Sequence, residues 1–252
     1  KATLNSIINQ SFKDFECIII NDESNDNSLE IVENFIAFDS RFRLYNQKKK
    51  GVVSARNLGI KKSVGRYITF LDADDLWHKD FLKESITFRN KFNYPLPITH
   101  TSYVRFSQNK ECIKLFSINP PQEIYYKNIL RKNFLPLLTA MIDREVIKDL
   151  EFEELRPEDY KLWIDLIYIK RNKSILIDKK LAFYRISDSQ RSKNKLKSLF
   201  RIYKFFLNLP ETSFLKRRLN FFNWIFFNIL QRLLTKKIYR RDYLEYIKFL
   251  SH

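Results

Sequence analysis

Residues 67–75 read Tyr-Ile-Thr-Phe-Leu-Asp-Ala-Asp-Asp, an apolar run that stops at a cluster of acidic side chains. Compact runs of branched and aromatic residues are typical of strands, so Tyr67–Leu71 predicts a short strand. The acidic cluster begins where this strand ends, at Asp72. A strand that ends in carboxylates is a candidate for one side of a ligand site.

The segments around this strand alternate between helix and strand patterns. Asn25 and Asp26 can cap a helix, and apolar residues at helical spacing follow them. The expected elements of the second half include a helix that opens at Pro157 and closing strands at 174–177 and 180–184. Those of the first half are a helix at 4–8, strands at 15–20 and 42–45, and helices at 52–62 and 80–90. Such alternation predicts an α/β fold with an open, mainly parallel sheet flanked by helices.

Acidic side chains follow two of the predicted strands. Asp22 follows the strand at 15–20, and Asp72 and Asp74 follow the strand at 67–71. Ligands bind at the carboxyl ends of strands in open α/β sheets, so we expect these residues to face one site. Two carboxylates on a bend suit Mn²⁺ or Mg²⁺, with a diphosphate filling other coordination positions. The pattern alone is not specific, because aspartates after a strand also cap turns.

A basic residue lies in the segment 51–59, which reads Gly-Val-Val-Ser-Ala-Arg-Asn-Leu-Gly. Arg56 and nearby backbone amides stand on or near a predicted helix start, and both favour phosphate oxygens. An ordinary surface arginine is the alternative. The segment therefore indicates a phosphate site only in combination with the acidic residues.

Several motifs occur in an order and spacing that resemble family 2 glycosyltransferases. Residues 4–16 resemble the opening helix of that family, and Ile19–Asp26 resembles its second-strand motif. The later motifs are Ser54-Ala55-Arg56-Asn57-x-Gly59, Gly65-Arg66-Tyr67-Ile68, Phe70-Leu71-Asp72-Ala73-Asp74-Asp75, Pro157-Glu158-Asp159-Tyr160-x-Leu162-Trp163 and Tyr184-Arg185. The resemblance covers about residues 3–192, and the ordered set is far more specific than any one motif.

The resemblance implies a GT-A fold and an inverting, single-displacement transfer from a nucleotide diphosphate sugar, with Mn²⁺ or Mg²⁺ as cofactor. By motif, Asp22 would contact the base and Arg56 would help to hold the nucleotide. Asp72 would approach the ribose or the metal, and Asp74 would bind the metal directly. Asp159 would be the catalytic base.

The role of Asp159 has a physical reason. Inversion needs a carboxylate on the acceptor side to take the proton of the attacking hydroxyl. The alternative is that Glu158 and Asp159 complement the dipole at a helix start, which is a common arrangement. The motif order favours the catalytic role.

The sequence also departs from the family pattern. Asn21 stands where the family often has aspartate, and Glu23 where it often has glycine, so we expect a different local backbone because glutamate tolerates a left-handed turn poorly. Ser187 occupies the region of a histidine that can reach the metal. The sequence begins at Lys1 inside the first helix, so we expect that it lacks the preceding strand of the family.

Composition narrows the partners. The 252 residues include 46 Lys and Arg against 29 Asp and Glu, a net charge of +17. This excess favours polyanionic partners, namely nucleic acid, an anionic membrane face or phosphorylated substrates. No motif for specific nucleic-acid recognition is present, and no apolar stretch of about 20 residues predicts a spanning helix.

The basic tail, residues 193–252, differs in character from the rest. One helical face of 219–233 is apolar and is flanked by Lys and Arg, so the tail could lie on an anionic bilayer or pack on the domain. We expect residues 1–115 to bind the nucleotide sugar and 116–192 to supply the acceptor side and the base. The expected location is cytoplasmic, including the inner face of the plasma membrane.

The predicted function is an inverting glycosyltransferase that uses a UDP-linked sugar in lipopolysaccharide, capsule or other cell-surface glycan synthesis. The acceptor is then a glycan or a lipid-linked glycan. A noncatalytic basic protein that binds RNA or a membrane is the alternative from another class. A nucleotidyltransferase ranks below both, because no glycine-rich, lysine-bearing phosphate loop is present.

Overall fold

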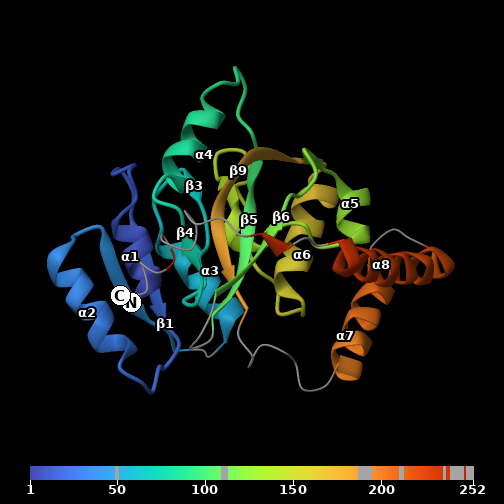
Figure 1. Cartoon of the computed structure of the whole chain (residues 1–252), viewed down its shortest axis with the longest axis horizontal. Coiled ribbons are helices and arrows are strands. Elements are labelled where there is room, and N and C mark those ends of the chain that lie inside the picture. Colours follow the sequence, from blue (N-terminus) through green and yellow to red (C-terminus); the bar gives the residue numbers. More distant parts are fainter. Residues whose placement is uncertain are drawn as a thin grey trace.

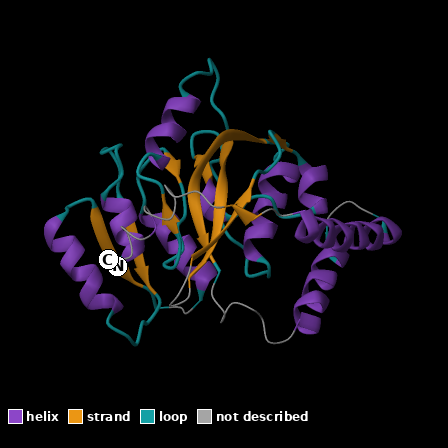
Figure 2. Ribbon diagram, in the orientation of Figure 1, coloured by secondary structure: helices purple, strands orange, loops and turns teal. Residues whose placement is uncertain are grey.

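The computed structural model describes residues 1–48, 51–108, 113–186, 195–209, 213–234, 237–238 and 247. Strands form the centre of the molecule, and helices cover them on both sides (Figure 1). The ribbon coloured by secondary structure shows β1 and β2 at one end and the last two long helices at the other (Figure 2). The α/β fold class predicted from the sequence is therefore confirmed.

The first part of the chain alternates helices and strands as predicted. Its elements are α1 (Ala2–Ile8), β1 (Cys17–Asn21), α2 (Ser28–Phe38), β2 (Phe42–Asn46) and α3 (Val52–Lys62). Strands β1 and β2 pair in parallel and form a two-stranded sheet of their own. Helix α3 packs against β1, and this places the start of α3 beside the end of that strand.

A second sheet of eight strands carries the rest of the domain. Its strands are β3 (Tyr67–Ile68), β4 (Leu76–Trp77), β5 (Ile98–Gln108), β6 (Ile113–Ile118), β7 (Glu123–Ile124), β8 (Ala140–Asp143), β9 (Ser174–Arg185) and β10 (Lys237–Ile238). The order β10–β6–β5–β8–β3 forms its main path, and β9 pairs with β4, β5 and β7.

The large sheet is mixed rather than mainly parallel. Only β5 and β9 run parallel in it, and its other described pairs are antiparallel. The connection from β5 to β6 is too short for the crossover that a parallel neighbour needs, so the chain returns antiparallel. The alternation of elements in the first part of the chain does not reveal this change of direction.

Helices complete the fold around this sheet. They are α4 (Phe81–Arg89), α5 (Tyr126–Arg131), α6 (Glu158–Ile164), α7 (Lys195–Leu207) and α8 (Phe214–Leu234). A 3₁₀ turn covers Leu137–Thr139, and a π-helical segment, Asp165–Ile169, continues α6. The predicted helix after Pro157 is therefore present, but it changes to π geometry after two turns.

One face of the basic tail packs on the domain. Phe205, Phe206 and Phe221 are buried in the cluster that also contains Trp163 and Ile142. The tail also contributes the short strand β10, which pairs with β6 and which the helical pattern did not predict. None of the helices in the described chain is long and apolar enough to cross a bilayer.

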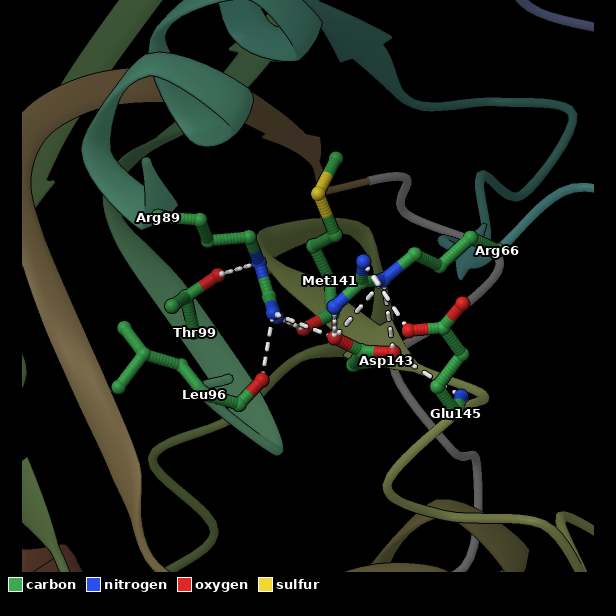
Figure 3. Close-up of polar contacts among 7 residues, drawn as sticks. All are labelled: Arg66, Arg89, Leu96, Thr99, Met141, Asp143 and Glu145. Carbon is green, nitrogen blue, oxygen red and sulfur yellow. Dashed lines mark hydrogen bonds and ion pairs between the residues drawn. The ribbon is translucent and has the colours of Figure 1, made fainter. Parts of the chain in front are cut away.

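Buried charges join β8 to α4 and to the start of β3 (Figure 3). The Asp143 carboxylate is only 1% exposed and pairs with Arg66 at 2.9 Å. Arg89, also buried, lies 4.0 Å from the same carboxylate and donates to the backbone carbonyls of Leu96 and Met141. Burial lowers the pKa of Arg89 to about 10, and the guanidinium therefore stays charged at neutral pH.

Two boundaries differ from the sequence prediction. The strand predicted at 67–71 is strand only at Tyr67–Ile68, because the only partner of β3 in the described sheet, β8, pairs with those two residues. The two closing strands predicted near 174–177 and 180–184 form one strand, β9, whose register against β5 shifts around Ser102. Ser187 lies outside the described residues.

Candidate active site

Arg56 joins two of the predicted motifs that are far apart in sequence. Its Nη2 lies 3.0 Å from Oδ1 of Asp72, and its Nη1 lies 3.3 Å from Oε1 of Glu158. The Arg56 side chain is 12% exposed, whereas that of Asp72 is 52% exposed. The guanidinium thus lies between the acidic loop, residues 72–75, and the start of α6.

Aromatic and amide contacts hold Arg56 and its helix in position. Its guanidinium carbon lies 5.3 Å from the centre of the Phe152 ring, a cation–π contact. The neighbouring Asn57 holds the backbone of Phe152 in both directions, because its amide donates to the Phe152 carbonyl and accepts from the Phe152 N–H, each at 2.8 Å. Asn57 therefore ties α3 to the segment before α6, so Arg56 is held in position.

Asp159 lies at the beginning of α6, next to the partner of Arg56. Its Oδ2 accepts from the Asn133 amide at 2.8 Å, and its Oδ1 accepts from the Tyr160 N–H at 2.8 Å. Burial, followed by the neighbouring Glu158 carboxylate, raises the pKa of Asp159. A carboxylate with a raised pKa is a stronger proton acceptor than an ordinary surface aspartate.

The acidic loop is held by the Tyr-Arg motif at the end of β9. The Arg185 N–H donates to Oδ1 of Asp75 at 2.7 Å, and Arg185 Nε donates to the Asp74 carbonyl at 2.8 Å. Burial raises the pKa of Asp75 to about 8, with further contributions from Asp74 and Asp72. Asp75 is 1% exposed, so its carboxyl fixes the loop, while Asp72 and Asp74 face outward to a greater extent.

Asp22, which follows β1, lies beside the N-terminus of α3. Its carboxylate accepts from the Gly51 N–H, with both oxygens at 3.1 Å, and from the Gln47 side chain. Gly51 has φ of 121° and precedes the helix. Asp22 thus contacts the residue that precedes α3, and Arg56 lies five positions after that residue, on α3 itself.

The backbone at Glu23, next to Asp22, adopts a left-handed turn. Glu23 has φ of 54°, although the glutamate led us to expect a different local conformation. Side-chain bonds stabilise this turn, because Asn21 Oδ1 accepts from the Ser24 N–H at 3.0 Å and the Asn21 amide donates to Asn46. The neighbouring contacts therefore hold a glutamate in a conformation that favours glycine.

The donor atoms of the acidic loop fit a hard divalent cation. Asp72 and Asp74 offer carboxylate oxygens two residues apart on a bend, and oxygen is the ligand that Mg²⁺ and Mn²⁺ prefer. Among the described residues, no group of three or more His, Cys, Asp or Glu side chains could hold a metal ion by itself. A cation here would therefore need further oxygens from another molecule, such as a diphosphate.

A cavity of about 660 Å³ lies away from these residues. It is lined by residues at the start of α5 and at the end of the π-helical segment, including Tyr125, Tyr168 and Arg171. Asp159 lies at the opposite end of α6. The cavity therefore does not belong to the candidate active site.

The structure brings together Arg56, Asp72 and the Glu158–Asp159 pair, and it places Asp22 against Gly51, the residue that precedes α3. Motif reasoning named Arg56 and Asp159 but did not assign roles to the side chains that support them. The supporting residues are Asn57, Asn133, Phe152 and Glu158. Asn57 and Glu158 stand inside recognised motifs, whereas nothing in the sequence marks Asn133 or Phe152.

Comparison with known sequences places the chain in one family. The sequence profile described as Glycosyl transferase family 2 matches residues 1–149. The chain is 31% identical over 201 residues to the *Escherichia coli* protein named UDP-Glc:alpha-D-GlcNAc-diphosphoundecaprenol beta-1,3-glucosyltransferase WfgD, covering 79% of this chain and 77% of that protein. It is 27% identical to the putative teichuronic acid biosynthesis glycosyltransferase TuaG of *Bacillus subtilis*, covering 94% of this chain and 91% of that protein.

Solved structures agree on the fold. Residues 1–349 of TarS from *S. aureus* superpose with a TM-score of 0.60 at 19% identity, covering 89% of this chain and 66% of that one. The mannosyltransferase PcManGT of *Pyrobaculum calidifontis*, in complex with GDP-Man and Mn²⁺, superposes with a TM-score of 0.59 at 12% identity, covering 90% of this chain and 68% of that one. With its mixed sheet, its flanking helices and a family profile over more than half of its length, the chain belongs to glycosyl transferase family 2 and has the GT-A fold.

Proposed function

We propose that this chain transfers a sugar from a UDP-linked donor to an acceptor hydroxyl, with inversion at the anomeric carbon, in the synthesis of a cell-surface glycan. The observation that carries this proposal is Arg56, which contacts Asp72 of the acidic loop and Glu158 beside the proposed base. One guanidinium therefore links the side of the site that would hold the diphosphate to the side that would receive the acceptor. The UDP-Glc in the name of the *E. coli* relative supports the choice of nucleotide.

The donor would lie against the first 115 residues. Arg56 would pair with diphosphate oxygens, because a guanidinium matches phosphate oxygens in geometry and charge. Asp22 would contact the base from the loop after β1, and Asp72 would approach the ribose or the cation. The face that accepts the second substrate would come from residues 116–192, which contribute Asn133 and Asp159.

A divalent cation, Mn²⁺ or Mg²⁺, would be held by Asp74 with Asp72 nearby. When bound, it neutralises the negative charge that the departing nucleoside diphosphate acquires. The role of this chain is then to present carboxylate oxygens on a loop that Arg185 and Asp75 hold in place.

The chemical step would depend on Asp159. The acceptor oxygen attacks the anomeric carbon and forms the new glycosidic bond, while the bond to the diphosphate breaks and its electron pair leaves with the diphosphate. The proton of the acceptor hydroxyl passes to the Asp159 carboxylate. Asn133 and the Tyr160 N–H hold that carboxylate in one orientation, and the raised pKa of Asp159 favours proton transfer.

The acceptor would be a glycan, including one carried on a lipid diphosphate at the cytoplasmic face of the plasma membrane. The lipid-linked acceptor in the name of the *E. coli* relative and the teichuronic acid assignment of the *B. subtilis* relative support this substrate class.

An assay of UDP release tests the proposal. With UDP-glucose, Mn²⁺ and a synthetic lipid-diphosphate GlcNAc acceptor, we expect acceptor-dependent release of UDP. Asp159→Asn should lower the rate by roughly 10²–10⁴, the usual contribution of a positioned base, with UDP affinity nearly unchanged.

Asp165→Asn is the matched control, because Asp165 lies on the continuation of the same helix and pairs with Lys161 at 2.6 Å, outside the site. Its transfer rate should stay close to that of the unchanged chain. A folded Asp159→Asn variant with full transfer activity would rule out the proposed base.

A further inference from the structure

The outward face of α8 is apolar from Leu215 to Ile229. Its exposed side chains are Leu215 (68%), Leu219 (54%), Phe222 (62%), Phe226 (61%) and Ile229 (56%). These positions recur at spacings of four and three residues, so they form one stripe along the helix. The opposite face packs on the domain through the buried Phe221 and the half-buried Trp224.

Helix α7, which packs against α8, also carries exposed apolar side chains. Its Phe200 is 57% exposed, and Phe214 at the start of α8 is 60% exposed. Most of the large hydrophobic side chains that are exposed in the described chain lie on these two helices. A cluster of this kind on a soluble surface marks a site of interaction with another apolar body.

Basic side chains border the stripe. Lys216 and Arg218 are exposed, and at 3.6 residues per turn they fall on the two sides of the line through Leu215 and Leu219. Exposed Arg201 and Lys204 lie on α7. The sequences of the two helices, 195–207 and 214–234, contain no Asp and no Glu.

The basic borders of the stripe, with no Asp or Glu in either helix, favour an anionic partner. The spacing of the stripe would also suit pairing of two α8 helices from two copies of the chain. Such a pair would bring like charges together without any acidic partner on either helix, which is unfavourable. An anionic bilayer supplies both an apolar layer for the stripe and negative headgroups for its basic borders.

We propose that α8 docks on an anionic lipid bilayer, with the stripe of Leu215, Leu219, Phe222, Phe226 and Ile229 inserted below the headgroups. Lys216 and Arg218 then contact the headgroup phosphates. The helix lies in the plane of the membrane and does not cross it.

The docking would orient the active site. Helix α8 lies at the end of the molecule opposite α2 and β1, and it packs against α5 (Figure 1). Arg131 of α5 lies 5.1 Å from the centre of the Phe227 ring on α8, and Asn133, two residues after α5 ends, holds Asp159. A bilayer on α8 therefore lies on the side of the molecule that carries the proposed base, where a lipid-linked acceptor would enter. This consequence rests on the proposed function, whereas the docking itself does not.

Sedimentation with vesicles tests the docking without donor or acceptor. The unchanged chain should bind vesicles that contain phosphatidylglycerol, bind neutral phosphatidylcholine vesicles much less, and lose affinity in high salt. The double variant Phe222→Ser/Phe226→Ser should bind at least about tenfold less, because two large apolar side chains no longer insert. Lys216→Gln/Arg218→Gln should reduce binding to anionic vesicles by roughly tenfold.

The matched control is Phe38→Ser/Val64→Ser, which removes two side chains that are 87% and 80% exposed elsewhere. It should bind vesicles as the unchanged chain does. Light scattering after gel filtration gives the second readout. Equal vesicle binding by the α8 variant and the control, or a dimer of the unchanged chain that the α8 variant dissociates, would overturn the proposal. Failure of the UDP-release assay with intact vesicle binding would contradict the proposed function alone.

Discussion

Asp159 and Glu158 are adjacent carboxylates at the start of one helix, and only one of them has a cationic partner at salt-bridge distance in the described contacts. Arg56 pairs with Glu158, whereas Asp159 bonds to the Asn133 amide and the Tyr160 N–H. Burial and the charge of Glu158 both raise the pKa of Asp159, and Arg56 opposes them. The contacts therefore suit two different roles, with Glu158 anchoring Arg56 and Asp159 as the proposed base.

This difference predicts a pH effect. A general base must be deprotonated, so transfer should rise with pH through the raised pKa of Asp159. Glu158→Gln removes a neighbouring negative charge and should move the acidic limb of kcat/KM to lower pH. The measurement is a pH profile of UDP release for both proteins, and an acidic limb that does not move would show that Asp159 is not the titrating base.

Glu23 gives a prediction on stability. A residue with a Cβ costs about 1–2 kcal/mol in the left-handed conformation, and Glu23 has φ of 54°. Glu23→Gly should therefore raise the free energy of unfolding by up to about 1 kcal/mol, after the greater freedom of glycine in the unfolded chain is subtracted. Urea denaturation checks this gain. Glu30→Gly in the first turn of α2 should instead be destabilising, and a loss in both variants would contradict the account.

At the scale of elements, the buried Asp143 holds three parts of the sheet region together. It ends β8, and its carboxylate meets Arg66 before β3 and Arg89 at the end of α4 (Figure 3). Removing one partner from such a cluster leaves buried charges without compensation, a change that usually costs about 3–5 kcal/mol. Asp143→Asn should lower the free energy of unfolding by about that amount, as measured in urea.

Glu145→Gln provides the comparison for Asp143→Asn. Glu145 pairs with the same Arg66 at 3.0 Å, but its side chain is 66% exposed, so its loss should cost less than about 1 kcal/mol. Similar losses of stability in the two variants would show that burial of Asp143 is not what makes this pair important.

The sequence predicted the bounds of some helices and strands more accurately than the pairing of others. Helix α3 has the predicted bounds, Val52–Lys62, and its segment has a clear start at Gly51. The antiparallel pairing of β3 with β8 depends on residues about 75 positions apart, and local pattern carries no information on such pairing. The same reason explains why β10 was missed, because a two-residue strand exists only through its partner β6.

At the scale of the molecule, the order of the motifs indicated which distant segments share one site, but not the side chains around them; the roles of the site residues stay predictions. Ordered motifs named Arg56, Asp72 and Asp159, and the Arg56 guanidinium contacts both Asp72 and Glu158, the neighbour of Asp159. Asn133 could not be predicted, because it lies after a short helix and carries no motif. The basic tail could not be placed from the sequence pattern alone, because an apolar stripe is equally compatible with burial and with exposure. The burial of Phe221 in the core shows which face of α8 points outward.

The measurement that tests the central claim most directly is calorimetric titration of UDP into the chain, with and without Mn²⁺, beside Asp74→Asn. The account predicts Mn²⁺-dependent binding that Asp74→Asn loses. Asp178→Asn, which changes an exposed aspartate on β9, should bind as the unchanged chain does. A folded chain that binds no UDP with Mn²⁺, or equal binding by Asp74→Asn, would contradict the claim that the acidic loop and Arg56 form a nucleotide-sugar site.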